Sequence, residues 1–174
     1  MEPSQLARFE AATLPHLDAA YTLARHLTLN QHDADDVVQE AFLRALKYFG
    51  GYRGGDARAW LLAIVRNTSR SWLRRERGDA GVVEFDEALH SEAIDDQHPE
   101  AEVLRAVDRE RVREAVDQLP LEFREVIVLR ELQGLSYKEI GEISGIPVGT
   151  VMSRLSRARR RLEGALGAGK GGLP

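Results

Sequence analysis

The chain of 174 residues contains no cysteine. Disulfide bonds and thiolate metal sites are therefore excluded, and a reducing compartment suits the sequence. Aromatic residues make up only 6% of the chain. No apolar run approaches the ~20 residues that a membrane-spanning helix needs. The N-terminal stretch MEPSQLARFEAATLPH also lacks the features of a signal peptide. We therefore expect a cytoplasmic protein.

Patterns that carry catalysis or hold metals are missing too. Five histidines are scattered without metal-ligand spacing: His16, His26, His32, His90 and His98. No serine–histidine arrangement is present, and the glycine-rich stretch GGYRGGD at 50–56 lacks the GK[ST] ending of a P-loop. The acidic stretch at 33–36 is followed by no further oxygen ligands at loop spacing, which disfavours a divalent-metal site. We expect no enzyme activity, metal, cofactor or small-molecule substrate.

The net charge is -4, but the two signs of charge are segregated along the chain. Between Asp79 and Glu102 every charged residue is acidic, whereas Arg58 to Arg77 carries six arginines against one glutamate. The last helical stretch is basic as well. Nucleic-acid binding depends on where positive charge gathers, so the negative total does not exclude it.

The stretch Leu135–Leu162 predicts two short helices joined by a tight turn. Ser136 and Glu139 form the pattern of a capping box, and Gly145 provides the left-handed residue that ends a helix. Pro147 suits the first turn of the next helix, where its missing N–H costs nothing. In that second helix one stripe is predicted to be buried: Val148, Val151, Leu155, Ala158 and Leu162.

The remaining positions of the second helix are mostly basic or hydroxylic. They are Thr150, Ser153, Arg154, Arg157, Arg159, Arg160 and Arg161. Guanidinium groups match phosphate oxygens and guanine edges, and a helix-turn-helix places its second helix in the major groove. The pattern favours a DNA-reading helix over an ordinary solvated basic face.

The N-terminal part of the chain predicts a first helix or helix pair over 6–29, which Pro15 would break early, a second helix over 33–49 and a third over 57–77. Asp33 is the expected N-cap of the second helix, whose outer face carries Asp36, Gln39, Glu40 and Leu43. From the residues alone, this face is a solvated surface more readily than a docking surface. In the third helix, the expected buried stripe is Trp60, Leu61, Ile64, Val65, Thr68 and Trp72.

The third helix also carries a basic row. Arg66, Arg70 and Arg74 recur at four-residue steps. Asn67 lies beside them and carries an amide, a group that can bind base edges. Tyr52, in the preceding glycine-rich loop, either stacks on bases or belongs to the core; the residues alone leave this open.

The C-terminal part predicts helices over 101–119 and 121–132, ended by Pro120 and Gly134, before the helix-turn-helix. The fold class is therefore all-α. We expect two helical domains, at 1–77 and 103–166, joined by a flexible acidic linker at 78–102, and a disordered tail at 167–174.

Three blocks of sequence resemble one family. They are DADDVVQEAFLRAL, RAWLLAIVRNTSRSWLRR and LPLEFREVIVLRELQGLSYKEIGEISGIPVGTVMSRLSRARRRL. The chain resembles the extracytoplasmic-function (ECF) sigma factors, the smallest sigma subunits of bacterial RNA polymerase. The resemblance implies a sigma-2 domain, a sigma-4 domain and no sigma-3 domain between them.

The resemblance also implies roles for the residues described above. The face with Asp36, Gln39, Glu40 and Leu43 would dock on the clamp helices of the largest polymerase subunit, which reverses the solvated reading of that face. The −10 promoter element would be opened and read by Tyr52, Arg66, Asn67, Arg70 and Arg74. The −35 element would be read by Thr150, Ser153, Arg154, Arg157 and Arg161. Met152 stands where other members carry arginine, so −35 preference is not transferable from a relative.

The implied partners are core RNA polymerase, including the flap of its second-largest subunit, promoter DNA and an anti-sigma factor. The acidic linker would lie in the polymerase channel in place of nucleic acid. The function that follows is promoter-specific transcription initiation by an alternative sigma factor. The main alternative is a stand-alone helix-turn-helix regulator, which would bind duplex DNA tightly without polymerase. Neither the promoter nor the anti-sigma factor follows from the sequence.

Overall fold

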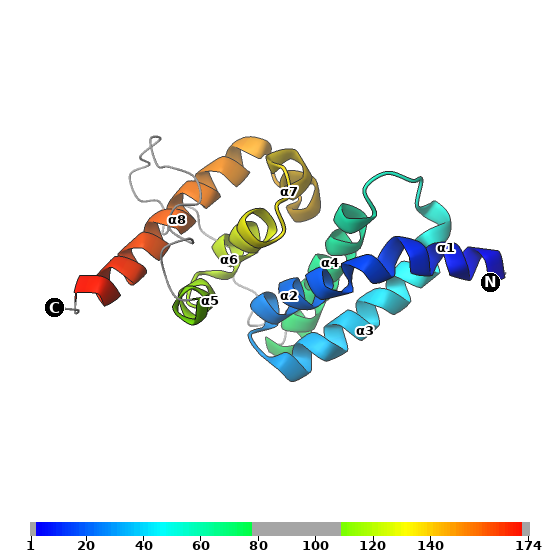
Figure 1. The fold of residues 1–174 in the computed structure, drawn as a ribbon, viewed down its shortest axis with the longest axis horizontal. Coiled ribbons are helices and arrows are strands. Elements are labelled where there is room, and N and C mark those ends of the chain that lie inside the picture. Colours follow the sequence, from blue (N-terminus) through cyan, green and yellow to red (C-terminus); the bar gives the residue numbers. More distant parts are fainter. Residues whose placement is uncertain (1–2, 78–108, 172–174) are drawn as a thin grey trace. The chain divides into compact units, whose positions relative to one another are not determined.

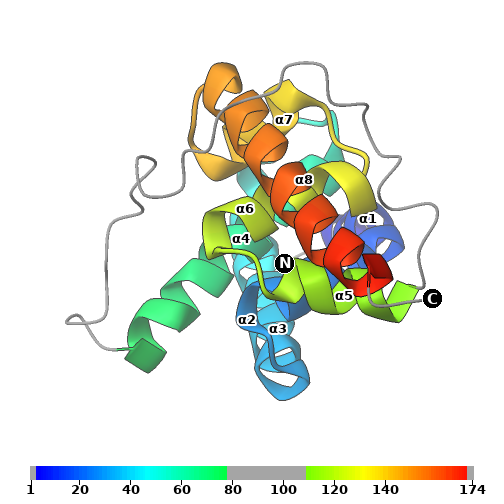
Figure 2. The same ribbon diagram turned by 90° about the vertical axis from the view of Figure 1, so that its left-hand side faces the viewer.

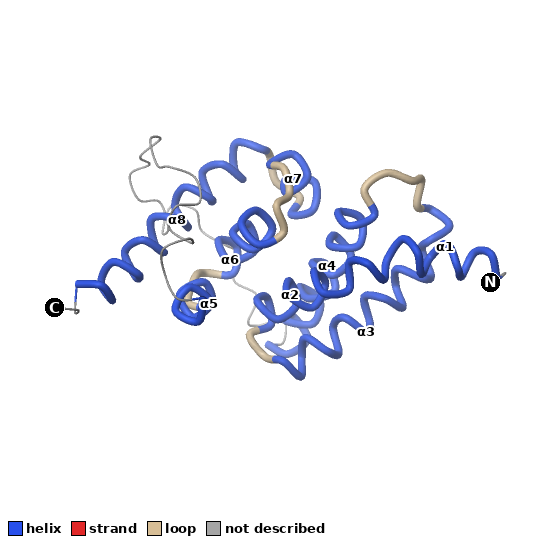
Figure 3. Tube along the Cα trace, in the orientation of Figure 1, coloured by secondary structure: helices blue, strands red, loops and turns tan. Residues whose placement is uncertain are grey.

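The computed structural model describes residues 3–77 and 109–171, and the predicted linker and the last three residues lie outside this part. In the part described, the chain is helical with short connections and contains no strand (Figure 3). It forms two compact units. Helices α1 to α4 build the first unit, and α5, α6, α8 and most of α7 build the second (Figure 1). No helix in these ranges is long and apolar enough to cross a membrane.

The first unit begins with a broken helix. The α1 helix (Pro3–Thr13) is followed by a short 3-10 turn, η1 (Leu14–His16), and then by α2 (Leu17–Thr28). Pro15 lies at the centre of this turn, where it removes a backbone donor and limits helix continuation. The sequence predicted this break at Pro15.

Helix α3 (Gln31–Tyr48) begins earlier than predicted. Its N-cap is Asn30, whose side chain accepts a hydrogen bond from the backbone N–H of Asp33 at 3.0 Å. The prediction of Asp33 as the N-cap is therefore wrong. Asn and Asp cap equally well, so residue type alone did not choose between them. Val37, Val38 and Ala41 are buried.

Helix α4 (Ala57–Arg77) packs against both α2 and α3, and these three helices form the core of the first unit (Figure 1). Its fully buried residues are Leu61, Leu62, Val65, Thr68 and Ser69. The stripe is thus rotated from the predicted one, since Trp60, Ile64 and Trp72 are only partly buried.

A buried hydroxyl that the predicted stripe leaves out, that of Ser69, explains part of this rotation. Thr68 donates to the backbone oxygen of Ile64 at 2.7 Å, and Ser69 donates to that of Val65 at 2.8 Å. Because a buried hydroxyl that is hydrogen-bonded carries little penalty, these positions face the core as readily as apolar ones. The predicted stripe correctly includes Thr68 but omits Ser69 and Leu62, and it therefore lies too far toward Trp60.

The second unit starts with α5 (Arg109–Asp117) and α6 (Leu121–Ile127), separated by Pro120. The predicted positions 101–108 of the first of these helices lie outside the described residues. Arg124 is buried and donates from Nη1 to the backbone oxygen of Leu119 at 2.7 Å. It therefore satisfies a carbonyl in the connection that follows α5, a role that sequence periodicity did not reveal.

The last turn before the helix-turn-helix is wider than an α-helix. The segment η5 (Val128–Leu132) is a π-helix, in which the N–H of Gln133 bonds to the oxygen of Val128 at 3.1 Å. Gly134 then ends the segment with φ 66°, as the sequence predicted. Helices α7 (Tyr137–Ser144) and α8 (Val148–Gly171) follow. Figure 2 shows α8 running across α5 and α6, with which it packs.

Candidate nucleic-acid interface

The turn between α7 and α8 is held by local contacts that the sequence predicted in part. Ser136 and Glu139 form the capping box, with the N–H of Glu139 bonded to Ser136 Oγ at 3.1 Å. Gly145 ends α7 in the left-handed region at φ 69°. Pro147 precedes α8 instead of lying within its first turn, and its carbonyl accepts from the N–H of Val151 at 3.1 Å.

Gly141 is a second glycine that this turn requires. A Cβ atom at this position would lie 2.8 Å from the backbone oxygen of Ile146, closer than real Cβ contacts come. The N–H of Ile146 in turn bonds to the oxygen of Gly141 at 3.0 Å. The absence of a side chain therefore lets the chain after α7 fold back onto this helix.

Helix α8 buries one stripe and exposes its first residue. Val151, Leu155 and Leu162 are buried as predicted, but Val148 is 43% exposed, so its prediction as a buried residue is wrong. Val148 lies over Gly141, with its Cγ2 3.9 Å from where a Cβ would stand. Because Gly141 offers no side chain to cover it, the valine stays open to solvent.

Arg159 does not belong to the outer face of α8. It is 8% exposed, and its Nε and Nη2 donate to Glu131 Oε1 at 3.0 and 2.8 Å. Burial lowers the pKa of Arg159, but hydrogen bonds to Glu131 and Tyr137 outweigh burial and raise it above its ordinary value. This ion pair joins α8 to η5, so the sequence interpretation of Arg159 as part of the DNA-facing side is corrected.

The proposed −35 readers lie on the rest of α8. Thr150, Ser153, Arg154 and Arg157 are partly exposed, and Ser153 Oγ donates to the backbone oxygen of Thr150 at 3.1 Å. The guanidinium of Arg161 lies 5.5 Å from the centre of the Phe123 ring. Arg161 thus has a packing role on α6 alongside any role at the DNA.

In the first unit, Tyr52 belongs to an aromatic cluster. Its ring stacks on Phe49 at 5.6 Å and lies 5.1 Å from Trp60, and its hydroxyl donates to the backbone oxygen of Gly55 at 2.8 Å. The glycine-rich loop therefore has a fixed aromatic support. Tyr52 is still partly exposed, so its ring both packs and presents surface.

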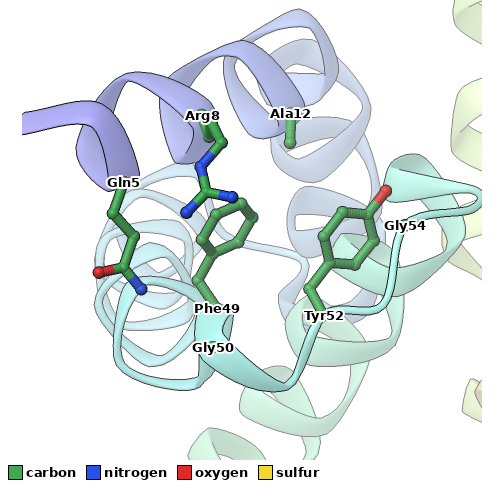
Figure 4. Close-up of a pocket in the computed structure, with 7 residues that line it drawn as sticks. All are labelled: Gln5, Arg8, Ala12, Phe49, Gly50, Tyr52 and Gly54. Carbon is green, nitrogen blue, oxygen red and sulfur yellow. The ribbon is translucent and has the colours of Figure 1, made fainter.

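Next to Tyr52 lies a pocket of about 380 Å³. Gln5, Arg8 and Ala12 of α1 line one side of it (Figure 4). Phe49 of η2 (Phe49–Gly51) and Tyr52 line the other, with Gly50 and Gly54. An aromatic wall beside a guanidinium and an amide is suited to a flat polar ring such as a nucleobase.

The basic row of α4 lies apart from this pocket's lining. Arg66 and Arg70 are partly exposed and Arg74 is exposed. Asn67 is exposed, and its Oδ1 accepts from Arg66 Nη1 at 3.1 Å. This contact orients the Asn67 amide and leaves its two N–H donors available for an acceptor.

The outer face of α3 combines an exposed leucine with anchored charges. Leu43 is 63% exposed. Glu40 binds Arg44 of the same helix and Arg75 of α4, both at 3.0 Å. Asp36 lies 3.7 Å from His32, and Gln39 is exposed. The face therefore offers an apolar centre with polar groups around it, in the arrangement common at protein interfaces. In the described ranges, no group of three or more histidine, cysteine or acidic residues is placed to hold a metal ion.

Comparison with known proteins assigns both units. Residues 14–78 match the model of sigma-70 region 2, and residues 109–162 match that of sigma-70 region 4. The chain is also 36% identical over 174 residues to the ECF RNA polymerase sigma factor SigE of Mycolicibacterium smegmatis, covering 93% of this chain and 67% of the relative. The chain belongs to the ECF sigma factor family.

Other sigma factors agree with this assignment. The sigma-H factor of Pseudomonas aeruginosa is 39% identical, with 77% of this chain and 73% of the relative covered. The sigma-E factor of Escherichia coli K12 is 38% identical, with 75% and 72% covered. The sigma factor RpoE of Bartonella quintana, solved with the anti-sigma factor NepR, has a TM-score of 0.72 at 29% identity, covering 92% of this chain and 97% of RpoE.

As a member of this family, the chain is an alternative sigma factor that directs promoter-specific transcription together with core RNA polymerase. Its ligands are promoter DNA and the polymerase. Sigma factors are non-catalytic initiation factors, and the stand-alone regulator is not favoured by these matches.

Proposed function

We propose a division of labour within this sigma factor. A sigma-2 domain at 1–77 binds the polymerase and opens and reads the −10 element. A sigma-4 domain at 103–166 reads the −35 element, and the acidic residues 78–102 between them substitute for nucleic acid in the polymerase channel. The observation that supports this most strongly is that α8, the second helix of the helix-turn-helix, has a partly exposed side rich in arginine. The geometry of the turn before it is fixed by Ser136, Gly141 and Gly145.

At the −35 element, α8 binds duplex DNA with Thr150, Ser153, Arg154 and Arg157, supported by Arg161. Arginine contacts to phosphates fix position, and contacts to base edges select sequence. The helix begins at Val148, so these residues lie within its first three turns. This is the part of the second helix that reaches base edges in a helix-turn-helix.

At the −10 element, the basic row Arg66, Arg70 and Arg74 follows the phosphates while Asn67 reads a base edge. The pocket beside Tyr52 holds one unstacked base against Phe49, with Arg8 at its side. Unstacking costs a few kcal/mol, and contacts to the extruded base offset that cost. This assignment gives the two sides of the first unit separate tasks on the same strand.

The α3 face with Asp36, Gln39, Glu40 and Leu43 binds the clamp helices of the largest polymerase subunit, and the second unit contacts the flap of the second-largest subunit. An anti-sigma factor covers these faces when the factor is inactive. Two solved structures that resemble this chain support such a partner. RpoE was solved in complex with the anti-sigma factor NepR, and CnrH was solved in complex with the cytosolic domain of CnrY. A chain acting on DNA and bacterial RNA polymerase works in the cytoplasm, without catalysis or a cofactor of its own.

Two alanine variants test the division of labour in run-off transcription with core polymerase. Arg157→Ala should weaken binding at the −35 element by ~1–3 kcal/mol, and Asn67→Ala should spare core binding while reducing selectivity among −10 sequences. Unchanged transcription with Arg157→Ala would reject its −35 role. An equal loss on every −10 sequence with Asn67→Ala would assign that residue a structural role instead.

A further inference from the structure

Two exposed apolar side chains stand at the start of α8. Val148 is 43% exposed and Met152 is 53% exposed, whereas Val151, Leu155 and Leu162 are buried. Residues four apart lie on the same side of a helix, so Val148 and Met152 form one apolar strip. We call these two residues the apolar strip. It occupies the first two turns of the second helix of the helix-turn-helix.

The neighbours of the apolar strip indicate what covers it. Ser153, Arg154 and Arg157 lie on the same helix and are suited to DNA. Gly149 lies between the two apolar residues in sequence, and open space surrounds the position of its missing side chain. A DNA duplex that contacts the first turns of α8 would therefore meet no side chain at position 149 as it approaches the strip.

The major groove has one apolar feature, the 5-methyl group of thymine. Resting on the proposed −35 role of α8, we infer that Met152, with Val148 beside it, determines specificity by packing on thymine methyl groups in the −35 element. Four residues of helix advance ~6 Å along its axis. Stacked bases on one strand are ~3.4 Å apart, so the strip spans about two base steps. It therefore selects thymines within two positions of each other.

The chemistry of methionine also sets what the site rejects. An arginine donates two hydrogen bonds to O6 and N7 of guanine, but the thioether of methionine has no donor. A guanine under Met152 would lose water from two acceptors and gain no partner in exchange. We therefore expect this sigma factor to disfavour guanine at the position where an arginine would select it.

The test removes single methyl groups from the DNA. Holoenzyme made from the full chain and core polymerase first selects active promoters from a library with a randomised −35 region. In a selected promoter, each −35 thymine is then replaced by deoxyuridine, which differs only in the methyl group. Replacements in the spacer serve as the matched control, and the rate of open-complex formation is the measured quantity.

We expect thymine to be enriched at one or two positions. Deoxyuridine at such a position should slow open-complex formation about threefold to fivefold, the effect of one buried methyl group. At the position that Met152 contacts, Met152→Ala should reduce the difference between thymine and deoxyuridine, and Met152→Arg should shift the selected base to guanine. Equal rates with thymine and deoxyuridine at every −35 position for the unmodified chain would overturn the inference.

A different result would contradict the proposed −35 role of α8. If Arg157→Ala leaves initiation unchanged on the same promoters, α8 does not read the −35 element at all. If Arg157→Ala impairs initiation while the methyl groups have no effect, the −35 role stands and only the inference about Met152 is wrong.

Discussion

Single residues decide whether the helix-turn-helix keeps its geometry. Gly141 is the clearest case, because the space that a side chain would need is occupied by the backbone oxygen of Ile146. The N–H of the same residue is bonded to the oxygen of Gly141 at 3.0 Å, and a backbone group has no flexible end to move aside. The position therefore controls how the chain between α7 and α8 folds back onto α7.

The substitution Gly141→Ala is expected to destabilise the second unit. Forcing a methyl group into such a contact costs roughly 1–3 kcal/mol. Gly164 provides the matched control, since it lies in α8 with nothing within 4 Å of its missing Cβ. Gly164→Ala should stabilise by about 0.4–1 kcal/mol. Urea unfolding of both variants measures the two effects, and equal effects would contradict the close contact at Gly141.

The ion pair of Arg159 and Glu131 is the second residue-scale feature, because its two side chains are 10% and 9% exposed. Removing one partner leaves a buried charge alone, which costs about 3–5 kcal/mol. We expect Arg159→Met to lower the free energy of unfolding by such an amount. Arg113→Met, at an exposed position of α5, should change it by less than about 0.5 kcal/mol.

The pH dependence of this pair follows from the raised pKa of Arg159. A cation whose pKa is raised by folding contributes its full stabilisation below its unfolded pKa, and loses it only as pH rises through the folded one. For a guanidinium this window lies at strongly alkaline pH. The destabilisation by Arg159→Met should therefore be the same at pH 7 and pH 9. A large difference between these two pH values would show that the arginine is not the charged partner.

At the scale of elements, the first unit carries its candidate sites on different helices. The pocket beside Tyr52 is lined from α1 and from the turn after α3, whereas the basic row lies on α4. Base capture and phosphate contact are therefore separable by mutation.

Filling the pocket should impair promoter opening specifically. Ala12→Phe places a ring inside the space, so an extruded base loses its site, whereas Ala11→Phe adds the same ring to an exposed position of α1 outside the lining. A fluorescent base analogue in the −10 non-template strand reports opening. We expect Ala12→Phe to lower the opening signal at least tenfold and Ala11→Phe to preserve it. Equal signals from both variants would show that the pocket holds no base.

The exposed face of α3 leads to a prediction about the affinity for core polymerase. Leu43 is 63% exposed, and burying a leucine is worth about 1.5–3 kcal/mol. Leu43→Asp should therefore weaken core binding tenfold or more, measured by titration of labelled chain. Leu14→Asp, at a leucine 52% exposed outside this face, is the control. Similar losses in the two variants would show general damage and not a docking face.

The sequence predicted most elements because their ends carry strong local signals. A helix boundary or break was predicted correctly at four places: the capping box of Ser136 and Glu139, Gly134, Gly145 and Pro15. It failed where several residues near a helix start were equally able to cap, as with Asn30 and Asp33. It failed in part on α4, where Thr68 was predicted to be buried but Ser69 was not, because the hydroxyl of Ser69 looks polar in a periodicity argument.

The sites were less accessible to sequence reasoning than the elements. Arg159 lies one position after the buried Ala158 and three before the buried Leu162, so the stripe could have indicated its burial. Its partner Glu131 lies in a different element, and no local pattern links the two. The pocket joins residues more than thirty positions apart, so only the fold reveals it.

At the scale of the whole molecule, the account requires two DNA-contacting units that act at separate promoter elements. From phosphate contacts of α8 alone we expect modest, strongly salt-dependent binding. We expect specific initiation to require that the polymerase sets the distance between the units. The chain should therefore hold a promoter duplex weakly by itself and tightly as part of the holoenzyme.

The most direct test is run-off transcription from a genomic promoter library, with and without core polymerase, beside the duplex affinity of the chain alone. We predict discrete RNA start sites that require both the core enzyme and this chain, and weak binding of the chain alone to the same promoters. Tight duplex binding by the chain alone, with no transcript from any template in the presence of core polymerase, would contradict the account.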